Sequence, residues 1–568
     1  MLFILPLHNC VQGGDKQSMI SDEFSEYYRE VLDTSYDCTD RIVLNAYFAL
    51  GQSPGGFRTW WRELMGSDDN LDNTNLMRFA GRFARRIRAY AEKESIPLIY
   101  CKSGDRKHDL GKAYLPSDPN FKGVFCIMAS RAPAPVYDIQ RFKTGGMNIT
   151  RKTPSPWVNH YSFHIIDPQW GWVTIRLIPH PPFNAMVILN GHEYVAKQAR
   201  EKELSFTKED NCFTEISNGA GLATIADTMK VPDFVGRLAQ VCERWIYSSC
   251  LCFALTLEEQ KKSRFRYSYS VYQSEYSRNL LFSTGRMMDK VFNGVIDRTR
   301  SALDLKTIKT IFGYKQRPGK RKTGKPPRFE VVVEKPDYGL TVLRIHFASL
   351  TVKIYSKGER VLRIEAVSHN TRYLRCGRVI ENFPRIVNAL KKILERFLQV
   401  LRAADISFLD TDALEKWHLP GVVGATRVGG VDMNKPRLQA VMKAITALST
   451  NPLGFTASEL AEKMKENSSD FYAGSYTARN ASYDLKKLRG KKLVRLINRS
   501  RRYEATREGL HSMAAFITLR ENVLMPLLAG ASKGRKITTP PNQSEVDLRY
   551  QNIQQEMLKL FETVGIAA

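Results

Sequence analysis

The segment from residue 437 to residue 529 constrains the fold of this chain more than any other stretch of the sequence. Residues 437–448 carry apolar side chains at helical spacing and predict one helix. After a short break, Thr456 is followed three positions later by Glu459, which is the pattern of a capping box and predicts the start of a second helix. The segment therefore opens with two helices in succession.

A third helix and a hairpin follow. Residues 476–489 predict the helix, which Gly490 would end as a C-cap residue. Residues 493–497 and 503–505 predict two strands joined by a basic turn. Side chains of the third helix that can reach base edges or phosphates are Thr477, Arg479, Asn480, Lys486 and Arg489. Arginines of the turn, which suit the minor groove or the DNA backbone, are Arg499, Arg501 and Arg502.

Three helices followed by a basic hairpin are typical of winged helix-turn-helix domains that bind DNA. The segment resembles the MarR-type winged-helix regulators, although the loop before its third helix is longer than is usual in that family. The alternative interpretation is a small helical domain with a solvated hairpin, which could serve as a dimerisation module. An amphipathic pattern at Ile553, Met557 and Leu560 offers a second route to a homodimer.

The charge of the chain favours a polyanionic partner. Its 85 lysine and arginine residues outnumber 58 aspartate and glutamate residues, and the net charge of +27 indicates nucleic acid before membrane. DNA is the expected partner and RNA the alternative. No apolar run is long enough to span a bilayer, and nine scattered cysteines favour a reducing, cytoplasmic environment. Residues 1–18 lack the basic start of a secretory signal, and Met19 offers an alternative start.

The sequence predicts an α+β, multidomain protein. Helices and strands intermingle ahead of the winged helix-turn-helix, which indicates a mixed α/β body with antiparallel sheet segments. The expected segments are a possible over-extended start (1–18), an N-terminal α/β domain (19–150), a strand meander followed by a helical segment (151–310), a basic linker (311–328), β-hairpins with a long helix (329–405), a glycine-rich connector (406–436), the winged helix-turn-helix (437–530), and a linker with a tail helix (531–568).

Two charged features mark the N-terminal segment. Asp40 and Arg41 open an apolar run that predicts a core strand, where Asp40 could hold a metal ion or could be a turn residue paired with Arg41. Residues 76–93 predict an amphipathic helix whose polar surface is crowded with arginines. Because like charges at this spacing repel one another, they need a partner, either a phosphate backbone or a carboxylate-rich neighbouring domain. The arginines that we assign to nucleic acid are Arg78, Arg82 and Arg86.

Residues 157–189 predict a meander of strands. His160 and His164 lie four positions apart and would share one face of a strand. Two histidines can begin a metal site, but no third ligand stands at a useful spacing. We therefore interpret both histidines as structural.

The junction between this meander and the next helix carries further candidates. Asn190 and Glu193 are spaced as in a capping box, which is a sufficient structural explanation for them. His192 has no such explanation, and a histidine beside a glutamate at a helix start suits acid–base chemistry. His192 and Glu193 are therefore candidate catalytic residues.

Residues 267–282 are denser in tyrosine than any other stretch, and the spacing of the tyrosines predicts the packed face of a helix. The alternative interpretation is that Glu275 and Tyr276 face a cleft. In that case Tyr276 could act as a nucleophile towards a phosphodiester.

Residues 351–366 predict a hairpin with a concentration of polar side chains. Gly358 marks its turn, and period-two alternation places the apolar residues on one face. The opposite face carries four donors and one carboxylate, namely Lys353, Tyr355, Lys357, Arg363 and Glu365. Such a face could bind a phosphate group and a divalent metal ion, or it could be an ordinary exposed strand face.

The pattern from Lys353 to Glu365 resembles the K-x-Y-D-K…L-R-x-E hairpin of a widespread bacterial family of long basic proteins, some with a MarR-like C-terminal domain. The similarity covers most of residues 20–530, including the motifs DRIVLNAY, NGHEYVA and QSEYSRNLLF. The chain departs from the family at Ser356, where an aspartate is usual, and this weakens a metal role for the turn. A shorter, local similarity links the hairpin to rolling-circle replication initiators, whose strands flank a tyrosine nuclease centre.

The resemblance implies an association with mobile DNA and marks the family's recurring polar positions. These are matched here by Asp40, Arg41, Asn190, His192, Glu193, Glu275, Tyr276, Lys353, Tyr355, Lys357, Arg363 and Glu365.

We therefore expect a DNA-processing protein that selects its site through the winged helix and cleaves or rejoins a phosphodiester in the body. Residues expected to take part in catalysis are Asp40, His192, Glu193, Glu275, Tyr276, Tyr355 and Glu365. Residues expected to hold Mg²⁺ or Mn²⁺ are Asp40, Glu193 and Glu365. Residues expected to neutralise phosphate are Arg41, Lys353, Lys357 and Arg363. The alternative is a non-catalytic, MarR-like regulator that binds DNA or RNA.

Overall fold

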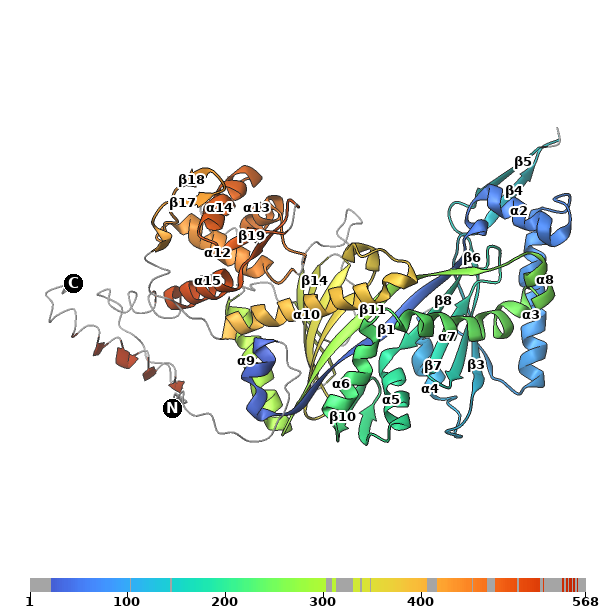
Figure 1. Ribbon diagram of the computed structural model, residues 1–568, viewed down its shortest axis with the longest axis horizontal. Coiled ribbons are helices and arrows are strands. Elements are labelled where there is room, and N and C mark those ends of the chain that lie inside the picture. The colour runs from blue at the N-terminus through green and yellow to red at the C-terminus, as the bar shows by residue number, and fades with distance from the viewer. Residues whose placement is uncertain are drawn as a thin grey trace.

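The computed structural model describes most of the chain (Figure 1). Its described residues are 22–302 apart from 103, 144 and 145, then 309–312, 330–337, 340–347, 349–405, 416–466 apart from 452, 476–521 apart from 498 and 499, and isolated positions between 525 and 559. Several predictions lie outside these ranges, namely those for residues 1–18, most of the basic linker, Arg499 and most of the 531–568 tail.

A single sheet of twelve strands forms the frame of the molecule, in the order β12-β13-β14-β15-β16-β11-β1-β8-β7-β6-β3-β2. Its two long central strands, β1 (Leu32–Phe48) and β11 (Tyr267–Phe282), pair antiparallel and cross the molecule (Figure 1). The other strands of this sheet are β2 (Leu98–Tyr100), β3 (Gly123–Pro133), β6 (Trp157–Asp167), β7 (Gly171–Leu177), β8 (Ala185–Asn190), β12 (Lys309–Phe312), β13 (Glu330–Asp337), β14 (Leu340–Phe347), β15 (Leu350–Lys357) and β16 (Val361–Ser368). The body is therefore mixed α/β with a mostly antiparallel sheet, which joins three of the segments expected from the sequence.

Small hairpins and helices surround this sheet. The hairpins are β4 (Tyr137–Arg141) with β5 (Met147–Arg151), β9 (Phe206–Glu209) with β10 (Cys212–Ile216), β17 (Gly421–Val423) with β18 (Thr426–Val428), and β19 (Val494–Leu496) with β20 (Tyr503–Ala505). The helices are α1 (Glu23–Tyr27), α2 (Pro54–Met65), α3 (Asn73–Lys93), α4 (Lys107–Lys112), α5 (Gly191–Glu201), α6 (Gly219–Asp227), α7 (Phe234–Ser249), α8 (Leu257–Lys262), α9 (Gly285–Ala302), α10 (Phe383–Asp405), α12 (Pro436–Leu448), α13 (Ala457–Glu466), α14 (Ala478–Gly490) and α15 (Arg507–Leu519). Among the described residues, no helix is both long and apolar enough to cross a lipid bilayer.

Helix α3 forms where the amphipathic pattern predicts it. The Asp72 side chain caps its first turn by accepting from the Asn75 backbone N–H, and its apolar stripe is buried. Phe83 from this stripe packs on Tyr161 and Phe163 of β6, with ring centroids 4.7 Å and 6.3 Å apart. The helix thereby covers one face of the sheet.

The prediction of a helix over residues 267–282 is wrong, because this stretch is the strand β11. Its neighbours are β1 on one side and β16 on the other, so its backbone groups pair along most of its length. Successive side chains of a strand point to opposite faces. Glu275 and Tyr276 therefore cannot face one cleft together.

The C-terminal elements α12 to α15 gather over one end of α10 (Figure 1). They enclose a core of their own, and Val400 and Ala403 of α10 pack against Ala447 and Leu510. The predicted order of three helices and a hairpin is confirmed; α12 and α13 begin within one residue of their predicted starts, and α14 begins two residues later than predicted. Thr456 and Glu459 form the expected reciprocal bonds, with each backbone N–H donating to the other residue's side chain.

Gly490 does not end its helix as a left-handed C-cap residue. It is the last residue of α14, Lys491 is the C-cap residue, and the positive φ of 58° falls on Lys492. A Cβ atom at position 490 would lie 2.6 Å from Val428 Cγ2. Glycine is therefore needed there because the β17–β18 hairpin approaches the helix closely.

Candidate functional site

A β-bulge in β1 sets the position of Asp40. Strand β1 pairs with β11 at Thr39 and again at Ile42, but β11 advances by one residue fewer over the same stretch. Bulges redirect side chains and are common beside functional sites. Asp40, 1 % exposed, points into the protein, whereas Arg41 is exposed and forms no ion pair among the described residues. The predicted pairing of Asp40 with Arg41 as a turn is thus wrong.

The start of α5 places His192 beside Asp40. Strand β8 leads directly into this helix, and the Asn190 side chain caps it by accepting from the His192 backbone N–H at 2.9 Å. The other half of the expected capping box does not form, because Glu193 accepts from Lys208 Nζ at 2.6 Å. His192 is completely buried, and its Nδ1 lies 2.6 Å from Asp40 Oδ1.

The polar face predicted for residues 351–366 forms, but it is covered by the protein. Across β15 and β16, Lys353 pairs with Glu365 and Tyr355 with Arg363, as the alternation predicts. The fifth member of this face, Lys357, donates to the Asn211 side chain at 2.9 Å. The interpretation as an ordinary exposed strand face is therefore wrong.

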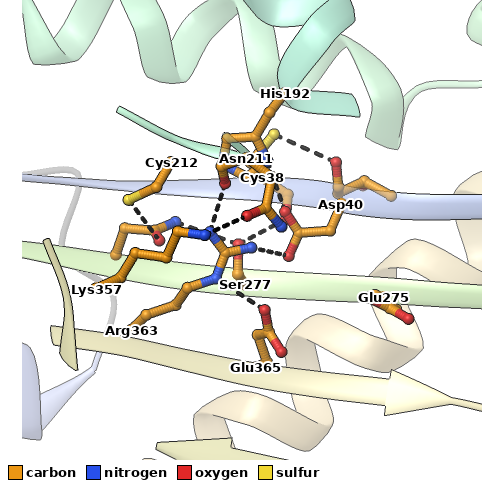
Figure 2. Close-up of polar contacts among 12 residues, drawn as sticks. Cys38, Asp40, His192, Asn211, Cys212, Glu275, Ser277, Lys357, Arg363 and Glu365 are labelled. Atoms are coloured by element: carbon orange, nitrogen blue, oxygen red, sulfur yellow. Dashed lines mark hydrogen bonds and ion pairs between the residues drawn. The ribbon is translucent and has the colours of Figure 1, made fainter. Parts of the chain in front are cut away.

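These side chains form one charged network, which Figure 2 shows with Arg363 between Asp40 and Glu365. Arg363, 0 % exposed, contacts Asp40 Oδ2 through Nη2 at 2.5 Å and Glu365 Oε1 through Nε at 2.8 Å. Glu365 also accepts from Lys353 Nζ at 2.8 Å and from the Tyr355 hydroxyl at 2.7 Å. With the contact between His192 and Asp40, five elements (β1, α5, β15, β16 and the β9–β10 hairpin) meet around one buried guanidinium.

The electrostatics of the network keep its carboxylates ionised. Burial alone would raise the pKa of Glu365, but the charges of Lys353 and Arg363 outweigh it and hold the pKa far below its usual range. Asp40 behaves likewise, since Arg363 and then His192 lower its pKa against the effect of burial. Burial and the neighbouring Glu365 raise the pKa of Tyr355 well above its ordinary value. The network thus holds ionised carboxylates that are weak bases and a phenol that stays protonated.

Glu275 lies apart from the ion pairs, at the edge of the network (Figure 2). It is half-buried and accepts from Gln273 Nε2 at 2.8 Å. Burial raises the pKa of Glu275, and the opposing charge of Lys353 does not fully offset this. Its pKa is thus shifted in the opposite direction to those of Asp40 and Glu365.

The expected metal ligands do not converge on one point. Both oxygens of Asp40 and both of Glu365 already face cations or donors, and Glu193 is paired with Lys208. Within the part of the chain that the structure describes, no three His, Cys, Asp or Glu side chains gather as a metal ion would require. Mg²⁺ or Mn²⁺ binding stays a prediction.

Tyr276 belongs to a different cluster. Its hydroxyl donates to Asp37 Oδ2 at 2.8 Å, and Arg278 Nε contacts Asp37 Oδ1 at 2.7 Å. Burial first, and then Asp37, raise the pKa of Tyr276 well above its ordinary value. A tyrosine held in this way is a poor nucleophile.

Residues that the sequence did not single out complete the network. The Asn211 backbone carbonyl accepts from Arg363 Nη1 at 2.5 Å, and the Tyr36 hydroxyl lies 3.4 Å from His192 Nε2. Tyr36 also accepts from the Phe213 backbone N–H at 2.8 Å. A tyrosine in an alternating strand and an asparagine in a hairpin turn are common, so no local signal marks them.

The arginines predicted to contact nucleic acid differ in their surroundings. On α3, Arg82 forms an ion pair with Glu259 at 2.8 Å, so for this residue the neighbouring carboxylate is the observed partner. Arg86 donates to the Cys252 carbonyl, and Arg78 to Asn75.

We compared the chain with protein-family models, curated proteins and solved structures, and none of the three comparisons gave a match.

Proposed function

We propose that the chain binds duplex DNA through the outward face of α14, as the recognition helix of a winged helix-turn-helix domain. The order α12, α13, α14 and the β19–β20 hairpin supports this assignment. So does the large excess of basic residues in the chain.

The observation that carries the proposal is the division of α14 into an anchored face and a polar, cationic face. Leu485 and Leu488 are buried, and Asp484 is held by Arg437 Nη2 at 2.5 Å and by the Tyr476 hydroxyl at 2.8 Å. These contacts fix the orientation of the helix.

The opposite face of α14 is open to solvent. Arg479 is exposed, Lys486 half-exposed, and Tyr483, 56 % exposed, lies between them. Thr477 caps the helix, with its hydroxyl donating to Asn480 Oδ1 at 2.6 Å. A fixed helix that presents Arg, Lys and amide groups outward suits a major groove. Tyr483 belongs to this face although the sequence did not predict a DNA contact for it.

The hairpin arginines divide into two roles. Arg502 donates to the carbonyls of Leu453 and Gly454 at 2.7 Å and 2.6 Å, and contacts Glu459 at 3.1 Å, so its guanidinium is occupied within the protein. Arg501 is exposed and is the described hairpin residue that could reach a phosphate. We therefore assign a structural role to Arg502 and a DNA contact to Arg501.

Fluorescence anisotropy with a labelled duplex of random sequence tests this proposal. We expect Arg479→Ala and Lys486→Ala each to weaken binding about tenfold, the equivalent of one lost charge-assisted hydrogen bond. Lys261→Ala, which removes an exposed lysine of α8, is the matched control and should leave the affinity unchanged. Duplex RNA should bind more weakly, because its narrow major groove excludes a helix. The proposal is contradicted if the protein does not bind the DNA duplex, or if Lys261→Ala weakens binding as much as Arg479→Ala and Lys486→Ala do.

Phosphodiester cleavage is the second candidate function, and Glu275 is the observation that favours it. A half-buried carboxyl with a raised pKa beside Lys353 can donate a proton to a leaving oxygen. Against this, Arg363 and Glu365 are buried and paired with each other, so they would contact a phosphate only after the protein opens. The geometry therefore supports binding more strongly than cleavage.

Incubation with labelled single-stranded and duplex DNA, in Mg²⁺ or Mn²⁺, separates the two functions. If the chain is a nuclease, Glu275→Gln should abolish cleavage while binding is retained. Glu381→Gln, at an exposed position, should cleave as the unaltered protein does. Absence of cleavage on every substrate would leave binding as the function.

A further inference from the structure

A hollow of about 680 Å³ lies in the body, away from both α14 and the charged network. Its floor is formed by β1, β8, β7 and β6, on the face of the sheet opposite α3, since His160 alternates with the Tyr161 that packs on that helix. Its far wall is the segment after β16, where Arg378 and Val379 are held by β11. The Val271 backbone N–H donates to the Arg378 carbonyl at 2.7 Å.

Among the residues that the structure describes, the hollow is lined by two arginines and by no carboxylate. Arg176 donates through Nε to His160 Nδ1 at 3.1 Å, and Arg378 lies over the Tyr272 ring at 5.8 Å. Neither arginine forms an ion pair among the residues that the structure describes. Two guanidinium groups around one concavity, without a counter-charge, favour the binding of an anion.

A buried histidine also lines this hollow. His160 is 5 % exposed, and because Arg176 donates to its Nδ1, the neutral ring carries its proton on Nε2. This Nε2 has no hydrogen-bond partner of normal geometry within the described chain. Burial, and then Arg176, lower the pKa of His160 to about 4, with a smaller opposing contribution from the Ala132 backbone carbonyl. Because Nε2 is inaccessible to solvent, His160 holds Arg176 in place and does not itself contact a ligand in the hollow.

The size and walls of the hollow indicate more than a simple anion. Its volume lies in the range of about 300–1,000 Å³ that is typical of small-molecule sites. Pro133, Ile178 and Met186 give it apolar walls, whereas Asn45 and Asn184 offer amide groups. A ligand that is flat and partly apolar, with hydrogen-bonding groups at its edges and an anionic group at one end, fits this combination.

We propose that the hollow binds a nucleoside that carries a phosphate group, with Arg176 and Arg378 on the phosphate and the base between the apolar walls and the amides. Two sources share this chemistry, a free mononucleotide and the phosphorylated end of a single strand. The site does not depend on the proposed role of α14, because it lies on different elements.

Isothermal titration of the full chain with thymidine 5′-monophosphate and with thymidine tests the proposal. We expect the phosphorylated ligand to bind at least tenfold more tightly. Arg378→Gln should weaken its binding about tenfold, by loss of one charge-assisted contact. Arg372→Gln is the matched control, because it removes an exposed arginine of the same segment that does not line the hollow.

An octathymidylate with and without a 5′-phosphate distinguishes the two sources. The ligand is a strand end if only the phosphorylated strand binds and Arg378→Gln weakens that binding about tenfold. The ligand is a free nucleotide if the mononucleotide binds with an affinity equal to that of the strand. The proposal is overturned if phosphate adds nothing to the affinity of any ligand, if none binds, or if Arg372→Gln weakens binding as much as Arg378→Gln. Duplex binding by Arg378→Gln, measured in parallel, should be unchanged, so failure of this site and failure of the α14 proposal are distinguishable.

Discussion

Replacing Asp40 by asparagine would remove a buried charge at nearly constant volume. Asp40 and Arg363 are 1 % and 0 % exposed, and their Oδ2 and Nη2 atoms lie 2.5 Å apart. Breaking a buried ion pair by removing one partner costs about 3–5 kcal/mol, because the other charge is left uncompensated. Since Glu365 still faces Arg363 at 2.8 Å, we expect the lower end of that range, about 3 kcal/mol.

The matched control is Asp33→Asn, which breaks an ion pair of similar length at the surface. Asp33 and Arg360 lie 2.6 Å apart with side chains 47 % and 30 % exposed, and such pairs contribute about 0–1 kcal/mol. Urea unfolding, followed by the fluorescence of the buried Trp60 and Trp61, measures both variants. If Asp40→Asn is as stable as Asp33→Asn, the ion pair with Asp40 does not stabilise the buried Arg363 charge, and the reasoning is refuted.

Three further predictions concern pH and packing. Burial lowers the pKa of His164 to about 4, below the ordinary value of about 6.5, so the imidazole gains a proton less readily in the folded protein than in the unfolded chain. The free energy of unfolding should therefore fall as the pH drops from 6.5 towards 4, with a loss of about 2 kcal/mol between pH 7 and pH 5. Urea unfolding at several pH values should show a smaller loss in His164→Gln. Gly490→Ala should destabilise the protein by about 1–3 kcal/mol, because the added Cβ atom would contact Val428 of β18. Gly236→Ala in α7 should stabilise it slightly, because the space around that position is open. Thermal melts in which Gly490→Ala is the more stable of the two would contradict this prediction. Arg502→Ala should lower the melting temperature and Arg501→Ala should not, since only the former is bonded within the protein.

Local signals in the sequence were sufficient for the parts of the fold that local chemistry determines. The capping pair Thr456 and Glu459 places the start of α13 because both bonds form within one turn. Period-two alternation likewise predicts that Lys353 and Glu365 share a face, because the hairpin turn at Gly358 fixes the register. These elements lie close to their predicted bounds.

Long-range pairing could not be predicted from the sequence. The contact between Asp40 and Arg363 joins strands that are far apart in the chain, and the bulge that aims Asp40 has no sequence signature. Residues 267–282 were expected to be helical because tyrosines recur at helical spacing, yet pairing with two neighbouring strands overrides that spacing. The same tertiary override separates Glu275 from Tyr276.

The salt dependence of duplex binding tests the central claim most directly. For a protein that contacts phosphates, the logarithm of the binding constant falls linearly with the logarithm of salt concentration, by about 0.9 per phosphate contact. If Arg479 contacts a phosphate, Arg479→Ala should reduce the magnitude of this slope by about one, and Lys261→Ala should leave it unchanged. An unaltered slope in Arg479→Ala would contradict the proposal that the outward, cationic face of α14 binds duplex DNA.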